Sequence, residues 1–227
     1  MRWIDSSVKF EEEVRTKEII SLVERACRTC YQSLDKIEDG SAERLIRNCI
    51  KRGHESVLEH GKVTFRVVCD RAIMAEITRH RIASYSIEST RYCAYNKEKF
   101  GKELTFIYPN WYGEELRNAV SNFEPLTMAE QDKVANFGLI CDAARHCEET
   151  YFDLLDSGAT PEIARAVLPN CLKTEIVMTM NMRELRNFLR LRSSGAAHPD
   201  IRIIANQMLE LLRAAGLGIF FEDIENV

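Results

Sequence analysis

Apolar residues recur along this chain with two different periods, so strands and helices are both expected. The segment 62–70 has period two, with four apolar side chains alternating along one face, which predicts a strand. Segment 174–181, rich in Ile, Val, Thr and Met, predicts a second strand, and 104–108 predicts a short third strand that Pro109 ends. The apolar face of the first strand consists of Val63, Phe65, Val67 and Cys69.

Longer segments carry apolar residues at helical spacing. They predict helices at 14–33, 41–53, 70–79, 128–157, 160–169, 182–192 and 199–215. Residues 82–102 show no clear period and predict a functional loop. Because helix predominates, we expect a helix-rich α/β fold (mixed α+β) in which helices flank a twisted central sheet. The range 1–227 is expected to form one domain.

The ends of two helices carry recognisable signals. Ser41 is expected to be the N-cap of the second helix, and Gly53 its stop. Asp70, directly after the first strand, is expected to cap the helix that follows. Thr160-Pro161 predicts a helix start with proline in its first turn.

Composition excludes several classes of protein. With 45% apolar residues the chain can bury a substantial core, and the formal net charge of −4 gives no global field that would attract nucleic acid or anionic lipid. No apolar run reaches the roughly 18 residues of a membrane span, and the acidic start does not resemble a targeting peptide. We therefore expect a cytoplasmic protein whose eight cysteines stay reduced.

The segment 79–92, RHRIASYSIESTRY, has the most unusual composition in the chain. Guanidinium groups bind oxyanions through two parallel hydrogen bonds, and hydroxyls supply further donors, so the segment suits a phosphate or pyrophosphate. If the chain is extended there, Ser89 and Arg91 point to the same side and can hold one phosphate together. A solvated loop with ion pairs to Glu76 and Glu88 explains the same composition.

Several motifs resemble those of the flavin-dependent thymidylate synthases, the ThyX family. Arg79-His80-Arg81, followed after seven residues by Ser89, resembles the family signature. Further similar motifs are GHES at 53–56, LEH at 58–60, ARAVLP at 164–169, NMR at 181–183, NFL at 187–189 and LR at 191–192. The resemblance extends over roughly residues 14–215.

The resemblance implies methylation of dUMP to dTMP, with methylenetetrahydrofolate as carbon donor, FAD as hydride carrier and NADPH as reductant. It also implies a homotetramer with active sites shared between subunits, and no metal. FAD would be held by Ser56 of a neighbouring subunit and by Arg79, His80, Arg81, Ile87, Asn181, Met182, Arg183 and Asn187. The nucleotide would be held by Glu76, Ile77, Thr78, Arg79, Ile87, Glu88, Ser89, Thr90, Arg91, Arg165 and Arg192.

Arg192 matches the position that the family uses to activate the uracil ring. An arginine, with a pKa above about 12, cannot act as a general base, so its role would be to stabilise negative charge on the N3/O2 edge of the pyrimidine. Ser89 is interpreted as a phosphate ligand rather than a nucleophile, because a serine nucleophile needs an adjacent general base and the sequence indicates none. Cys171 lacks the surroundings of a nucleophilic cysteine.

Two positions depart from the family pattern. Ile87 stands where the family usually has Glu or Gln, and it offers no side-chain hydrogen bond. His198 lies two residues after the position, here Ala196, where some relatives place a flavin-contacting histidine. Ile87 motivates an alternative from another class, a nucleotide- or RNA-binding module that keeps the phosphate-binding arginines but not catalysis, although the net charge opposes RNA binding.

The remaining candidates have ordinary explanations. Cys27 and Cys30 form a lone CxxC, interpreted as two buried thiols rather than a zinc or redox site. His54 and His60 lack the spacing of a metal motif. Three arginines that share one helix face, Arg183, Arg186 and Arg190, are compatible with a solvated surface. No dinucleotide-binding glycine motif and no P-loop is present.

Overall fold

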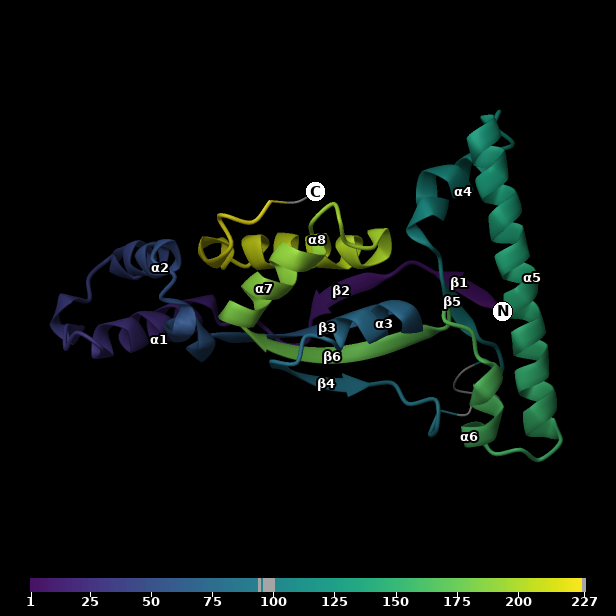
Figure 1. The fold of residues 1–227 in the computed structure, drawn as a ribbon, viewed down its shortest axis with the longest axis horizontal. Coiled ribbons are helices and arrows are strands. Elements are labelled where there is room, and N and C mark those ends of the chain that lie inside the picture. Colours follow the sequence, from purple (N-terminus) through teal and green to yellow (C-terminus); the bar gives the residue numbers. More distant parts are fainter. Residues whose placement is uncertain (94, 96–100, 226–227) are drawn as a thin grey trace. The chain divides into compact units, whose positions relative to one another are not determined.

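The computed structural model describes residues 1–93, 95 and 101–225. Helices and strands are both present and helix predominates, as the two sequence periods predict (Figure 1). The chain forms two compact units that each pack mainly within themselves. The first unit contains Met1–Ser6, Val68–Ala75 and Ile87–Glu175, and the second contains Ser7–Val67, Glu76–Ser86 and Ile176–Val227.

The main sheet has four strands in the order β2-β3-β6-β4. These strands are β2 (Ser7–Phe10), β3 (Lys62–Asp70), β6 (Lys173–Asn181) and β4 (Ala83–Ile87). The predicted strand at 62–70 is confirmed as β3, and its apolar face is buried throughout. The predicted strand at 174–181 is confirmed as β6, which begins one residue earlier.

The strand β4 corrects the prediction of a loop over 82–102. Its sequence, ASYSI, alternates Ala83, Tyr85 and Ile87 with two serines, and the three apolar positions are the more buried ones, as a strand with one covered face requires. The period of two covers only five residues inside a polar and charged segment, so it is a weak signal. Residues 94 and 96–100 of the predicted loop lie outside the described residues.

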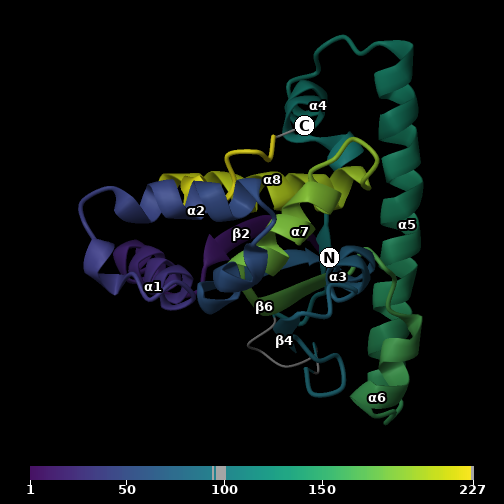
Figure 2. The same ribbon diagram turned by 60° about the vertical axis from the view of Figure 1, so that its left-hand side comes forward.

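In the second unit, helices α7 (Met182–Arg192) and α8 (Pro199–Ala214) lie on the same face of the sheet, as Figures 1 and 2 both show. Helices α1 (Thr16–Thr29) and α2 (Ser41–Lys51) pack against each other. All four were predicted, with ends that differ by a few residues. Five short 3-10 helices complete the described chain, at Leu34–Lys36, Glu55–His60, Asn110–Tyr112, Arg165–Val167 and Gly218–Phe220.

The expected helix-end signals were partly right. Gly53 adopts φ +70°, the left-handed conformation that ends α2, and the Asp70 carboxylate accepts a hydrogen bond from Ile73 N–H at 2.7 Å, as a cap should. Ser41 is wrong as the N-cap, because Gly40 holds that position. The Ser41 hydroxyl donates instead to the buried Glu24 carboxylate of α1, so it joins the two helices.

The first unit is built on a two-stranded parallel sheet of β1 (Arg2–Ile4) and β5 (Thr105–Ile107), with Trp3 opposite Phe106. Around it lie α3 (Arg71–Ile77), of which residues 71–75 belong to this unit, α4 (Glu114–Ser121), α5 (Met128–Asp156) and α6 (Pro161–Ala164). The ring of Phe137 on α5 stacks on Tyr112 at 4.0 Å and meets Trp3 at 5.0 Å. These aromatic contacts fix α5 to the sheet.

Of the two cysteines predicted to be buried, Cys27 and Cys30, only the first is buried. Cys27 is 4% exposed and its Sγ lies 3.5 Å from Cys49 Sγ, whereas Cys30 is exposed. Burial raises the pKa of the Cys27 thiol to about 12, which keeps it protonated. Within residues 1–93, 95 and 101–225, no helix combines the length and the apolar character that a membrane crossing needs.

The expectation of a solvated arginine face on α7 is right for Arg183 and Arg190 and wrong for Arg186, which is 1% exposed. Its guanidinium donates to both carboxylate oxygens of Asp223, at 2.7 and 2.8 Å, and to Glu55 at 3.1 Å. The hydrogen bonds from Arg186 lower the pKa of Asp223 to about 2. Arg186 therefore joins α7 to the C-terminal segment and to the 3-10 helix at Glu55–His60.

We expect Arg186→Met to destabilise the protein by about 3 kcal/mol, because it leaves two carboxylates without their buried partner. Arg190→Met is a matched control, because Arg190 binds the same Asp223 at 3.1 Å but is 55% exposed, and its loss should cost less than about 1 kcal/mol. Urea unfolding of both variants measures the difference. Equal losses would show that burial of Arg186 contributes nothing.

Candidate functional site

The predicted site residues divide between the two units. The first unit holds Ile87, Glu88, Ser89, Thr90, Arg91 and Arg165. The second unit holds Ser56, Glu76, Ile77, Thr78, Arg79, His80, Arg81, Asn181, Met182, Arg183, Asn187 and Arg192. Most of the predicted nucleotide loop thus lies in one unit and most predicted flavin contacts lie in the other.

In the second unit, the turn after α3 carries the Arg-His-Arg triplet. The hydroxyl of Tyr85 on β4 donates to the carbonyls of Ile77 and His80, at 2.9 and 2.7 Å, which fixes this turn. Burial raises the pKa of Tyr85 to about 12, so the hydroxyl keeps its proton. Arg79 and Arg81 are exposed and make no ion pair within the described chain, so their guanidinium groups can bind an anion.

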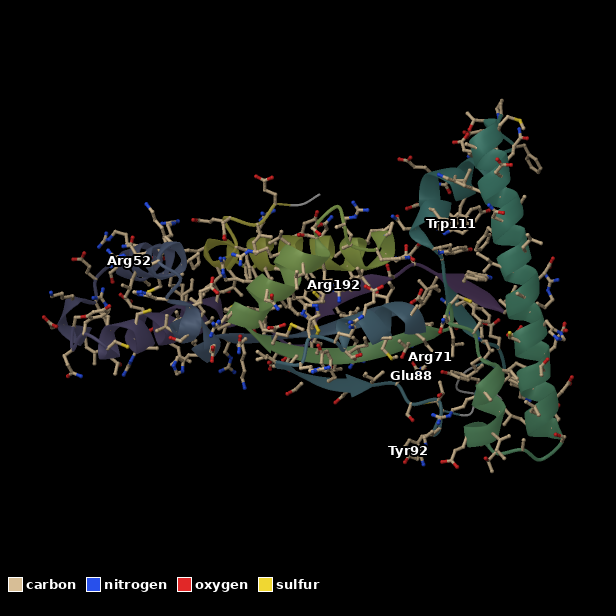
Figure 3. The ribbon with its side chains drawn as sticks, in the orientation of Figure 1. Arg52, Arg71, Glu88, Tyr92, Trp111 and Arg192 are labelled. Atoms are coloured by element: carbon tan, nitrogen blue, oxygen red, sulfur yellow. The ribbon has the colours of Figure 1, made fainter. Side chains whose placement is uncertain are left out.

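Arg192, the last residue of α7, is labelled in Figure 3. Its guanidinium is held on three of its nitrogens. Nη1 donates to Glu76 Oε2 at 2.9 Å, and Nη2 donates to the Glu76 carbonyl at 3.3 Å. Nε donates to His80 Nε2 at 3.1 Å. A guanidinium has five N–H groups, so two remain for a ligand on a side chain that is 20% exposed.

A cavity of about 400 Å³ in the second unit collects three of the predicted flavin residues, Asn181, Arg183 and Asn187. The other lining residues are Glu55, Glu59, Ile82, Glu184 and Arg190. Arg183 pairs with Glu59 at 2.6 Å, and this pair is half exposed, so a bound anion can replace the carboxylate at little cost. The cavity offers an amide, a guanidinium and an apolar side chain to one ligand.

Three further predicted residues of this unit differ in how far their side chains can reach a ligand. Ile77 and Met182 are fully buried, so their side chains belong to the core and only their main chains can reach a ligand. Ser56 is exposed on the 3-10 helix Glu55–His60, next to the cavity residue Glu55.

In the first unit, residues 89–92 form a turn, so the extended chain on which the joint phosphate grip of Ser89 and Arg91 was conditional is not found. The Ser89 carbonyl accepts hydrogen bonds from the N–H groups of Tyr92 and Cys93, at 3.2 and 3.0 Å. The Ser89 hydroxyl oxygen accepts from Arg91 N–H at 3.3 Å. Ser89 and Arg91 are thus adjacent through a turn rather than through strand alternation.

Glu88 anchors the start of this turn. Its carboxylate accepts from Lys173 Nζ at 2.9 Å and from the Tyr95 hydroxyl at 2.9 Å. Burial disfavours the charged form of Lys173, but its hydrogen bonds to Glu175 and Glu88 outweigh that effect and raise its pKa. Burial, with the adjacent Glu88, also raises the pKa of Tyr95. The Glu88 carboxylate is therefore occupied within the unit.

A cavity of about 400 Å³ in the first unit brings Thr90 and Arg165 together with Arg71. Glu162, Ala166 and Leu168 complete its lining. The Nη1 atom of Arg71, a residue labelled in Figure 3, is buried and has no hydrogen-bond partner among the described residues. Arg165 is exposed. Two guanidinium groups and a hydroxyl around one cavity are the donors that an oxyanion binds.

Arg91 lies at the edge of this arrangement. Its Nε and Nη2 both donate to Glu162 Oε1, at 2.9 and 2.7 Å. Both side chains are about half exposed, so the pair is weak and a phosphate can compete for the guanidinium.

Sequence reasoning did not single out Arg71 or Glu184, which the structure places among the candidate site residues. Arg71 had a legible signal, because it directly follows the strand 62–70 and begins the helix that leads to Arg79. Glu184 had no such signal, because an acidic residue in the first turn of a helix is explained by its favourable interaction with the helix dipole.

The sequence of this chain is similar to those of known proteins over most of its length. Residues 14–215 match the family described as "Thymidylate synthase complementing protein". A flavin-dependent thymidylate synthase of Geobacter sulfurreducens is 33% identical over 202 residues, which cover 86% of this chain and 78% of that protein.

Two solved structures share the fold. A UMP/dUMP methylase PolB from Streptomyces cacaoi, bound with 5-Br dUMP, has a TM-score of 0.76 at 25% identity and covers 100% of this chain and 99% of its own. ThyX from Helicobacter pylori, complexed with FAD and dUMP, has a TM-score of 0.69 at 26% identity and covers 96% and 100%. The resemblance in the arginine-rich motifs is thereby confirmed, and the chain belongs to the family of flavin-dependent thymidylate synthases.

Proposed function

We propose that this chain methylates dUMP to dTMP, using methylenetetrahydrofolate as carbon donor, FAD as hydride carrier and NADPH as reductant. The observation that carries the proposal is the fixed guanidinium of Arg192, which keeps two N–H groups for a ligand within the unit that holds the flavin-type residues. Family membership supplies the reaction class.

The residues of the second unit suit a flavin dinucleotide. FAD carries a pyrophosphate dianion, and the exposed Arg79 and Arg81 are free to bind it. Asn181, Arg183 and Asn187 line one cavity that can take a polar ring system. Bound in its reduced form, the flavin supplies the hydride that the methylation consumes.

The residues of the first unit suit the phosphate of a nucleotide. Arg71, Arg165 and Thr90 surround one cavity, and Ser89 and Arg91 lie in the adjoining turn. Arg71 contributes a buried donor that no described protein group accepts, and a phosphate oxygen would satisfy it. The Glu88 carboxylate supports the turn rather than the ligand.

Arg192 provides electrostatic stabilisation. Its guanidinium carries a permanent charge, so it would donate to the N3/O2 edge of uracil and stabilise the negative charge on that edge that makes C5 a better nucleophile. Because Glu76 and His80 hold the side chain in place, little reorganisation accompanies the reaction.

No enzyme nucleophile is required. The Ser89 hydroxyl makes its one described hydrogen bond to the Arg91 N–H and is not in contact with a base. Burial raises the pKa of Cys171 to about 11, so its thiol is protonated near neutral pH and is a poor nucleophile.

The functional assembly is proposed to be a cytoplasmic homotetramer in which residues 1–227 act as one catalytic domain. One dUMP would need both the phosphate-binding residues of the first unit and Arg192 of the second, supplied by neighbouring subunits that share each active site. Ser56 of a neighbouring subunit would complete the flavin site. Ile87 would contribute through its main chain.

The proposal is tested on purified protein. The protein should be yellow, or become so with FAD, should have the mass of a tetramer in solution, and should form dTMP from dUMP, methylenetetrahydrofolate and NADPH. UMP should be assayed beside dUMP, because the PolB relative is described as acting on both. A colourless, monomeric protein that forms no methylated nucleotide would refute the proposal.

Arg192→Ala is expected to lower turnover by roughly two to three orders of magnitude, because a preorganised donor to developing charge contributes about 3 kcal/mol. FAD should stay bound. Steady-state rates of dTMP formation and the flavin absorbance measure both quantities, with the exposed Arg25→Ala of α1 as control. Unchanged turnover would remove Arg192 from the mechanism.

For Ser89→Ala, we expect about tenfold weaker dUMP binding with measurable dTMP formation, because one hydrogen bond to a phosphate is lost. Calorimetric titration with dUMP and a dTMP assay at saturating nucleotide separate the two effects. Normal affinity combined with complete loss of turnover would indicate a nucleophilic serine instead.

Substituting Arg71→Met should raise the Kd for dUMP about tenfold or more and leave the Kd for deoxyuridine unchanged, because only dUMP carries the phosphate. Arg145→Met is the control in the same unit, since Arg145 pairs with Asp142 on the surface of α5. An equal loss for both ligands would place Arg71 away from the phosphate.

A further inference from the structure

His80 is buried between a carboxylate and a guanidinium. It is 6% exposed, and its Nδ1 lies 3.0 Å from Oε1 of Glu184, which is equally buried. Its Nε2 lies 3.1 Å from Arg192 Nε. The ring of Phe188 meets the imidazole edge to face at 4.8 Å and blocks its rotation.

The two partners determine where the imidazole carries its proton. A guanidinium N–H can only donate, so Nε2 must accept from Arg192 and must be unprotonated. The proton then lies on Nδ1, which donates to the Glu184 carboxylate. The opposite tautomer would turn an N–H toward the Arg192 N–H and leave Glu184 without its donor.

Glu184 is itself held in place. Its backbone N–H donates to Asn181 Oδ1 at 2.8 Å, which fixes the first turn of α7. Its carboxylate accepts from Asn187 Nδ2 at 3.2 Å. The carboxylate cannot turn away from His80 without breaking this second contact.

The contact between Glu184 and His80 also affects Arg192, at the C-terminal end of α7. Glu184 lies in the first turn of α7 and Arg192 is its last residue, so His80, from outside the helix, joins the two ends. With His80 on Nε and Glu76 on both Nη atoms, the guanidinium plane is defined from two sides. Loss of the His80 acceptor would leave only Glu76.

We propose that Glu184 is a positioning residue that acts through His80: it fixes the Nδ1–H tautomer, and that tautomer holds Arg192 in its reactive orientation. The catalytic consequence rests on the proposed function of Arg192. Both ring nitrogens of His80 are occupied within the unit, so His80 can contact a flavin only through ring carbons or its main chain.

Glu184→Gln tests this role with little change in volume. A glutamine can turn either its oxygen or its amide group to His80, so the tautomer is no longer fixed. We expect turnover to fall about 10- to 100-fold, as for other supporting partners of functional histidines, while FAD content, dUMP affinity and melting temperature stay close to those of the wild type. Glu210→Gln, at an exposed position of α8, is the matched control.

A double-mutant cycle distinguishes positioning from general support. If Glu184 acts through Arg192, Glu184→Gln should lower activity much less in an Arg192→Ala background than in the wild type. Equal fold losses in both backgrounds, or a loss of activity that follows FAD content and melting temperature, would overturn the proposal.

The nitrogen-15 spectrum of histidine-labelled wild-type protein tests the relay independently of activity. The His80 signals, assigned by their loss in His80→Asn, should show a protonated Nδ1 and an unprotonated Nε2. The opposite tautomer or a doubly protonated ring would overturn the proposal, even if Glu184→Gln does not fold. A wild-type protein without synthase activity but with this tautomer would refute the proposed function and leave the relay intact.

Discussion

Hydrogen bonding of arginines to carboxylates along α7 is the interaction on which the second unit depends. A guanidinium has only donors, so every buried arginine needs acceptors in fixed positions. Arg186 finds them in Asp223 and Glu55, and Arg192 finds them in Glu76 and His80. One helix thereby fixes its own packing through Arg186 and, with Arg192, holds in place the guanidinium that we propose acts on the substrate.

The pairing of arginines with carboxylates also explains how a chain with a net negative charge can offer sites for anions. Several arginines near the candidate cavities are already paired, either in the interior, as Arg186 is, or through half-exposed contacts such as Arg91 with Glu162. The exposed pairs are weak enough for a phosphate to displace the carboxylate. Binding can therefore exchange one partner for another rather than expose a bare positive patch.

Much of the fold could be predicted from the sequence, because strong periodicity marks elements that bury one face. Strand β3 and helices α5, α7 and α8 follow such patterns closely. The strand β4 was missed, because the alternation in Ala83–Ile87 is only five residues long and lies inside a polar, charged segment. Similarly, nothing local distinguishes the buried Arg186 from the exposed Arg190 four residues later, because the partners of Arg186, Asp223 and Glu55, are distant in the sequence.

The motifs also identified candidate site residues that line one cavity in the structure, namely Asn181, Arg183 and Asn187. They did not predict the hydrogen bonds that hold these residues in place. For anyone who handles the protein, Asp223 matters more than its place near the chain end suggests. Removing Asp223, by protease or by cloning, would leave the interior guanidinium of Arg186 with Glu55 as its one carboxylate partner among the described residues.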